Sequence, residues 1–262
     1  MRKAALAVIG MAAVLILVVA GCASASAPLR TTTPAPASVV PSVGAAASQA
    51  PAESENAGGG KLAEALVAAL QADPFVAHVD ESILASSLTG ATRITLTAKA
   101  VGDISGRDMA IHSTGTGGGP PTDQEVVSVG DVAWVRAKGT PTWHVHPRED
   151  VATSLDGLLQ TIRLIDDPSQ LVDMGVETLD GASVHHLTAP GFVPYTSPSG
   201  LEGNYDSFDV WTTDAGIPVL VKARFSAVEG VNSITGSTEI RYTNVGGPIA
   251  ITLPAGAPTL AP

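Results

Sequence analysis

The chain of 262 residues is 45% hydrophobic, 15% charged and only 4% aromatic, a composition typical of one soluble domain with additional sequence. Its formal net charge of −11, from 14 basic and 25 acidic side chains, argues against nucleic-acid binding and against electrostatic attachment to anionic lipid. The single cysteine excludes an intramolecular disulfide and a thiolate-rich zinc or iron–sulfur site.

The N-terminus has the pattern of a secretory signal. Basic residues precede an uncharged run at 4–20, which is short for a membrane span but typical of a signal peptide. The run ends in Val19-Ala20-Gly21-Cys22, which resembles a bacterial lipobox. The resemblance implies cleavage of residues 1–21 and acylation of Cys22, and an uncleaved signal anchor is the alternative. Anchoring by more than one acyl chain would hold the protein at the extracytoplasmic face of the cell membrane.

Residues 22–60 are expected to form a disordered tether that begins at the lipidated cysteine. They are almost wholly Ala, Ser, Pro, Thr, Val and Gly, and beyond Cys22 only Arg30, Glu53 and Glu55 are charged. No hydrophobic period persists, so the segment cannot bury enough surface to offset its ordering entropy.

The folded domain is expected at 61–254, followed by a flexible tail at 255–262. Residues 61–72 have helical periodicity, and Asp73-Pro74 ends the helix. Residues 75–91 fit either a strand or a bent connection. Alternating polar and apolar residues then predict strands at 93–100, 109–114, 126–129, 132–137 and 142–146.

A second helix is predicted at 149–165 from a continuous apolar stripe. Asp167-Pro168 then predicts the start of a short helix that ends near Gly175. Residues 189–204 are expected to be a long loop. The remaining predicted strands are 176–179, 183–188, 206–212, 219–227, 233–243 and 249–253.

Tight turns between consecutive strands, such as Asp180-Gly181 and Asp214-Ala215-Gly216, favour antiparallel pairing. The predicted fold class is therefore α+β, an antiparallel sheet of about ten strands whose apolar face is covered by two or three helices.

Three segments resemble turns and strands of the LppX/LprG-like lipoproteins of actinobacteria, a family with a LolA/LolB-like half-barrel. They are the hairpin at 176–186, the hairpin at 208–218 and the closing stretch at 242–249. The resemblance implies a strongly bent sheet with helices on its concave side. It also implies a cavity between sheet and helices that holds acyl chains, and binding or transfer of acylated lipids or glycolipids without an enzymatic step or a cofactor. An envelope transporter as a further partner is left open.

The apolar stripes of the predicted helices and of the strand at 219–227 would line such a cavity, and the scarcity of aromatic residues agrees with an incompletely filled interior. The predicted lining residues are Leu66, Leu70, Val151, Leu155, Leu158, Leu159, Ile162, Ile165, Val221 and Phe225. The alternative is a filled core, in which these stripes pack against each other and the protein is a non-enzymatic interaction or sensor module.

Chemical motifs are few. His144 and His146 are weak candidates for a metal site, because they share one face of a strand and His185 or His186 could supply a further ligand. The glycine-rich run at 115–119 lacks the Lys-Ser/Thr of a phosphate-binding loop. No nucleophile motif is present, so the sequence does not predict an enzyme.

Overall fold

The computed structural model describes residues 56–89, 91–117, 120–148, 151, 168–189, 193–196, 202–229 and 232–259. The predicted signal peptide, Cys22 and most of the tether lie outside the described residues, as does nearly all of the helix predicted at 149–165.

Helix α1 (Asn56–Leu70) confirms the first predicted helix, although it begins five residues earlier and ends two residues earlier than 61–72. Leu62, Leu66 and Leu70 recur at intervals of four and are buried, so they form the face that packs on the sheet. The helix contacts the 3-10 helix η2 (Pro168–Gln170) and two strands of the sheet.

Twelve strands form one sheet in which every pairing is antiparallel. They are β1 (Val76–Thr89), β2 (Thr92–Ser105), β3 (Asp108–Thr116), β4 (Thr122–Val129), β5 (Val132–Ala137), β6 (His144–Pro147), β7 (Val172–Leu179), β8 (Ala182–Ala189), β9 (Val193–Thr196), β10 (Glu202–Thr212), β11 (Pro218–Glu229) and β12 (Asn232–Thr243).

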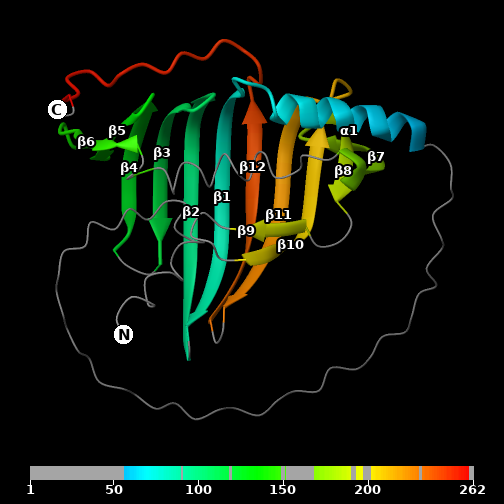
Figure 1. Ribbon diagram of the computed structural model, residues 1–262, viewed down its shortest axis with the longest axis horizontal. Coiled ribbons are helices and arrows are strands. Elements are labelled where there is room, and N and C mark those ends of the chain that lie inside the picture. Colours follow the sequence, from blue (N-terminus) through cyan, green and yellow to red (C-terminus); the bar gives the residue numbers. More distant parts are fainter. Residues whose placement is uncertain are drawn as a thin grey trace.

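The strand order brings the two ends of the domain together at the centre of the sheet. It runs β6-β5-β4-β3-β2-β1-β12-β11-β10-β8-β7, with β9 paired to β10 beside this path. Strand β1 therefore lies between β2 and β12. The strands β6 and β7 are the two edges, so the sheet is open (Figure 1).

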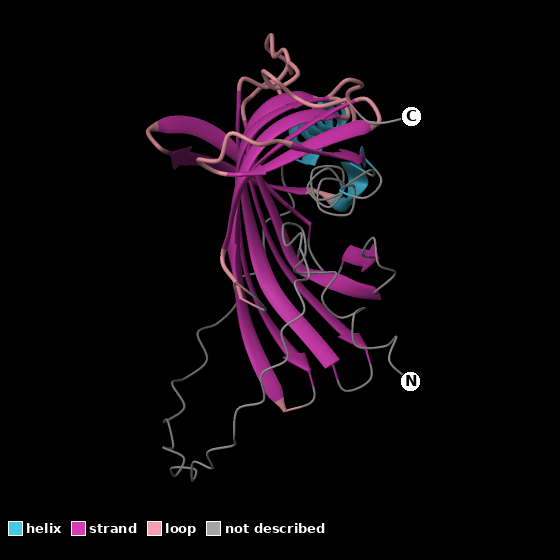
Figure 2. Ribbon diagram, turned by 90° about the vertical axis from the view of Figure 1, so that its left-hand side faces the viewer, coloured by secondary structure: helices cyan, strands magenta, loops and turns pink. Residues whose placement is uncertain are grey.

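The sheet is strongly bent, and Figure 2 shows it curving around the side on which α1 lies. In Figure 1, α1 crosses one end of the sheet near β10 and β11, while the long strands β1 and β2 continue well beyond the helix. A bent, open, antiparallel sheet with a helix on its concave side confirms the coarse fold prediction. The number of helices predicted, two or three, is not confirmed, because the helix at 149–165 falls outside the described residues.

Three sequence predictions are wrong in the described region. The short helix predicted from Asp167-Pro168 to Gly175 is only the single turn η2, because β7 begins at Val172 and pairs with β8. The strand predicted at 249–253 is irregular. The loop predicted at 189–204 contains β9, which hydrogen-bonds to the start of β10.

Candidate functional site

The concave face of the sheet is apolar. Side chains alternate in direction along each strand, so every second residue of a strand lies on this face. On β1, Ala77, Val79 and Ala85 are buried on this face. On the opposite, outer face His78 pairs with Asp103 at 2.7 Å, so this face is polar.

Small and large side chains share the concave face in the middle of the sheet. One row of paired residues runs across four strands from β1 as Ile83, Thr238, Ala223 and Phe208, and Ala98 on β2 continues it. Ile83 and Ala98 are only partly buried, as is Ile94 on β2, although all three belong to the apolar face. Apolar surface is therefore accessible beside β1 and β2.

Aromatic rings fill the concave face around β10 and β11. The ring of Tyr205 packs edge-on against Phe208, with centroids 6.1 Å apart, and against Phe225, at 6.3 Å. The neighbouring residue on β12 is Gly236, where a Cβ would lie 2.5 Å from the ring tip of Phe225. The absence of a side chain at Gly236 thus makes room for the Phe225 ring.

The predicted lining residues that the structure describes are all buried. They come from three separate parts of the chain: Leu66 and Leu70 from α1, Val221 and Phe225 from β11, and Val151. The other five lie outside the described residues: Leu155, Leu158, Leu159, Ile162 and Ile165. Their arrangement around a cavity stays a prediction.

A carboxyl group lies on the concave face, which the sequence did not predict. Glu81 is 1% exposed and pairs across the strands with Ala100 and Ile240. The Thr238 hydroxyl donates a hydrogen bond to Glu81 Oε1 at 3.2 Å. Burial raises the pKa of Glu81 to about 7, against a smaller lowering by this hydrogen bond.

Tyr242 lies near Glu81 on the same face. Its register partner on β1 is Val79, two residues from Glu81, and its ring packs edge-on against Phe75 with centroids 6.2 Å apart. Burial, together with the neighbouring Glu81 charge, raises the pKa of the Tyr242 hydroxyl well above its ordinary value. A phenol and a carboxyl whose pKa values are both raised by burial therefore share this part of the apolar face.

The sequence signal for Glu81 was present but ambiguous. Once 76–89 is assigned as a strand, the period of two puts Glu81 in line with Ala77, Val79 and Ala85. Residues 75–91 could not be assigned from sequence because Glu81 and Ser87 interrupt the apolar face and Leu84, 55% exposed, stands on the polar one.

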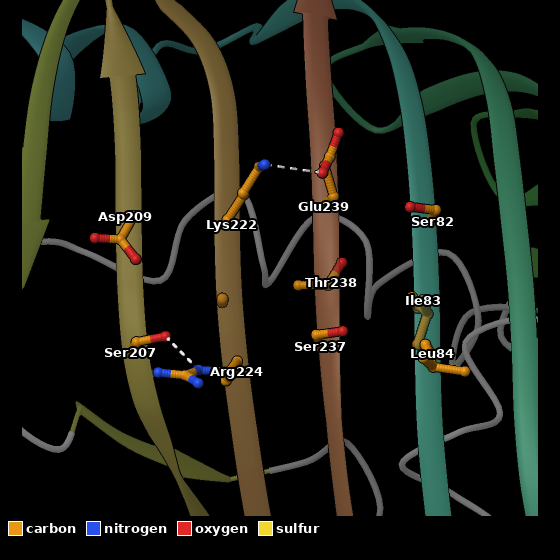
Figure 3. Close-up of a pocket in the computed structure, with 11 residues that line it drawn as sticks. Ser82, Ile83, Leu84, Ser207, Asp209, Lys222, Arg224, Ser237, Thr238 and Glu239 are labelled. Carbon is orange, nitrogen blue, oxygen red and sulfur yellow. Dashed lines mark hydrogen bonds and ion pairs between the residues drawn. The ribbon is translucent and has the colours of Figure 1, made fainter. Parts of the chain in front are cut away.

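A hollow of about 400 Å³ lies on the outer face of β1, β10, β11 and β12. Figure 3 shows its polar side chains on adjacent strands, with α1 behind the sheet. Lys222 pairs with Glu239 at 3.3 Å, and Arg224 Nε donates to the Ser207 hydroxyl at 3.2 Å. This open surface, on which charged and hydroxyl side chains stand beside Leu84, lies opposite the face on which the sequence predicted binding.

The two histidines of β8 belong to ion-pair and ring contacts of the sheet. His186 contacts Glu177 at 2.9 Å and Asp209 at 3.1 Å, and its ring stacks on Trp211 with centroids 4.5 Å apart. The hydrogen bond from the Trp211 indole is the main cause that lowers the pKa of the exposed Glu177, and His186 adds to it. His185 lies 3.6 Å from Asp173.

The weak metal candidates are not brought together. His144 and His146 lie on the edge strand β6, whereas β8, with His185 and His186, is next to the opposite edge. Within the described parts of the chain, no group of three His, Cys, Asp or Glu side chains is close enough to hold a metal ion. Nor do the described helices include one that is long and apolar enough to span a membrane.

No protein-family model matches the chain, and no curated protein matches it. Solved structures do. LprF from Mycobacterium bovis is 13% identical over 76% of this chain and 97% of its own, with a TM-score of 0.44. LprF belongs to the LppX/LprG family. The sequence led us to expect a resemblance to this family, and LprF is among the solved structures to which this chain is similar.

Two further matches are weaker. A LolA superfamily protein from Nitrosomonas europaea is 9% identical over 72% of this chain and 93% of its own, with a TM-score of 0.23. A putative outer membrane lipoprotein-sorting protein domain from Vibrio parahaemolyticus is 12% identical over 71% of this chain and 90% of its own, with a TM-score of 0.24. At such values no residue role and no ligand is transferred to this chain.

Proposed function

We propose that the protein is a lipoprotein of the cell envelope that binds acylated lipids or glycolipids against the concave face of its sheet, without catalysing a reaction. The observation that carries this proposal is the partly open apolar surface of β1 and β2, where Ile83, Ile94 and Ala98 are incompletely covered. A soluble domain normally covers such a surface, and long apolar chains are the ligands that match it.

Small side chains support the same proposal. Ala98 and Ala100 are neighbours on the concave face of β2, and Gly115 and Ser113 are their register partners on β3. Ala223 lies farther along the row of Ala98, beyond Ile83 and Thr238. A row of such residues leaves space above a bent sheet that larger aliphatic residues would fill. The lipobox resemblance at Cys22 supports a location on the membrane from which such ligands come.

The test is a substitution that places a large side chain on the concave face of the sheet, where the ligand is proposed to bind. Ala98→Phe places a ring on the concave face, whereas Thr97→Phe, at the exposed neighbouring residue, places the same ring on the outer face. We expect Ala98→Phe to weaken binding of a fluorescent fatty-acid methyl ester by at least about tenfold and to leave thermal stability near that of the wild type. We expect Thr97→Phe to bind as the wild type does.

A filled core gives a different result. In that case the wild type does not bind the probe, and Ala98→Phe lowers the free energy of unfolding by roughly 1–3 kcal/mol because it overpacks the interior. Organic extraction of the protein from its own host, followed by mass spectrometry, should find acylated lipid in the wild type and less in Ala98→Phe.

A further inference from the structure

Four polar residues form a cluster on the concave face, which we call the Glu81 cluster: Glu81, Ser113, Thr238 and Tyr242. All are at most 5% exposed. Strand register places Ser113 in the same row as Glu81, two strands away, because Ser113 pairs with Ala100 and Ala100 pairs with Glu81. Thr238 and Tyr242 lie on β12 on either side of Ile240, which pairs with Glu81.

Most polar side-chain atoms of the Glu81 cluster have no hydrogen-bond partner among the described residues. Thr238 donates to Glu81 Oε1. Among the described residues, however, Glu81 Oε2, Ser113 Oγ and Tyr242 Oη have no hydrogen-bond partner. Buried polar atoms without partners are uncommon because each one loses its hydration without compensation. Three of them on one face of the neighbouring strands β3, β2, β1 and β12 need an explanation.

Packing does not supply that explanation. Val79, Ala100 and Ile240 around Glu81 are apolar, so an aliphatic side chain at position 81 would fit this surface without the cost of burying a carboxyl group. The adjoining row on the same face holds Ile83 and Ala98, which are only partly buried. The cluster therefore lies next to the open part of the apolar face.

We propose that the Glu81 cluster is the head-group subsite of the lipid-binding face and selects acylated ligands that carry a free hydroxyl group. The inference rests on the proposed function and deepens it. A hydroxyl both donates and accepts a hydrogen bond, and Ser113 Oγ and Tyr242 Oη can each do either. The acyl chains would then lie along β1 and β2 over Ala98 and Ile83.

The charges around the cluster favour a neutral head group over an anionic one. The basic side chains His78 and Lys99 of the same strands lie on the outer face, where they pair with Asp103 and Asp80. A phosphate or carboxylate placed beside Glu81 would meet a carboxyl group, and His78 and Lys99 are not on that face to compensate its charge.

The experiment compares two competitors that differ only at the hydroxyl. The full chain is loaded with the fluorescent fatty-acid methyl ester, which is then displaced by 1,2-dipalmitoylglycerol or by its 3-O-methyl ether. We expect the free alcohol to compete about tenfold better with the wild type, the value of one well-formed buried hydrogen bond. Glu81→Leu and Tyr242→Phe should each reduce this preference to about twofold or less.

Two controls separate recognition from folding. Glu81→Gln keeps hydrogen-bonding groups at the same place and should retain most of the preference. Asp80→Leu changes the adjacent residue on the outer face and should leave the preference unchanged. Thermal unfolding of each variant shows whether it is folded, and probe binding shows whether the apolar face is intact.

The outcomes distinguish the two proposals. If the probe binds the wild type but both competitors displace it equally, the head-group subsite is wrong and the lipid-binding function stands. A preference that survives in both Glu81→Leu and Tyr242→Phe would also overturn the subsite. If the probe does not bind the wild type at all, the proposed function fails and the subsite fails with it.

Discussion

At the scale of single residues, Glu81 links the stability of the fold to pH. Burial raises the pKa of its carboxyl to about 7 in the folded protein, from the ordinary value of 4.5 expected in the unfolded chain. Folding therefore favours the protonated form. The contribution of Glu81 to stability is fully present below the unfolded pKa. It is lost as the pH rises from there through the folded pKa.

We expect the free energy of unfolding to fall by about 3 kcal/mol between pH 4.5 and pH 8 on account of this group, since one pKa unit corresponds to about 1.4 kcal/mol. Urea unfolding at a series of pH values measures the change. Glu81→Gln cannot ionise and should remove most of this slope. Glu239→Gln, at an outer-face residue that pairs with Lys222, should keep it. An equal slope in the wild type and in Glu81→Gln would contradict the assignment.

At the scale of elements, the turn between β10 and β11 determines how closely α1 approaches the sheet. Gly216 has a φ of +77°, and a Cβ there would lie 2.5 Å from the Cβ of Ala65 and 2.9 Å from the backbone nitrogen of Leu66. The turn is closed by a hydrogen bond of 2.9 Å from the Gly216 amide to the Thr213 carbonyl. Both the positive φ and the contact with α1 require glycine.

Gly216→Ala should therefore lower the free energy of unfolding by roughly 2–4 kcal/mol, about 1 from the backbone conformation and the remainder from displacement of α1. Gly181→Ala is the matched control. Gly181 has a φ of +84° but has no atom within 4 Å of the added Cβ, so only the backbone cost of about 1 kcal/mol applies. Equal losses in the two variants would show that α1 does not press against this turn.

Local sequence predicted most strands but could not assign every segment. Val172, Met174 and Val176 are 40–61% exposed on the edge strand β7, so its apolar side chains do not face the core. In the sequence the Asp167-Pro168 helix signal prevailed over this strand. Strand β7 forms because its backbone pairs with β8. Conversely, residues 249–253 have strand-like composition but pair with none of the described strands.

At the scale of the whole molecule, the predicted lipid anchor at Cys22 would determine where the protein is located. We expect Cys22→Ser to move nearly all of the protein from the membrane fraction to the soluble extracytoplasmic fraction, because no acyl chain can then be attached to the cysteine sulfur. Fractionation and immunoblotting of the producing cells measure this. Ser24→Ala, two residues along the tether, should leave the distribution unchanged. Retention of Cys22→Ser in the membrane would indicate an uncleaved signal anchor.

The order of strands is also a property of the whole molecule. Strands β1 to β6 form one half of the sheet and β7 to β12 the other, and the β1–β12 pairing joins them at the centre. The C-terminal segment returns across the sheet, where the Trp134 indole on β5 donates a hydrogen bond of 2.8 Å to the Pro258 carbonyl. Residue 258 belongs to the stretch at 255–262 that the sequence predicted as a flexible tail.

The sequence by itself determined what short-range chemistry decides: the helix from the spacing of Leu62, Leu66 and Leu70, the hairpins from Asp180-Gly181 and Asp214-Ala215-Gly216, and the alternating faces of strands such as 219–227. The tertiary structure alone decided what those faces hold. Thr238 reaches Glu81 across 157 residues of sequence, and it does so only because β12 pairs with β1 in one register. A shift of one residue would turn Glu81 to solvent, since side chains alternate between faces, and no local pattern specifies pairing between such distant strands.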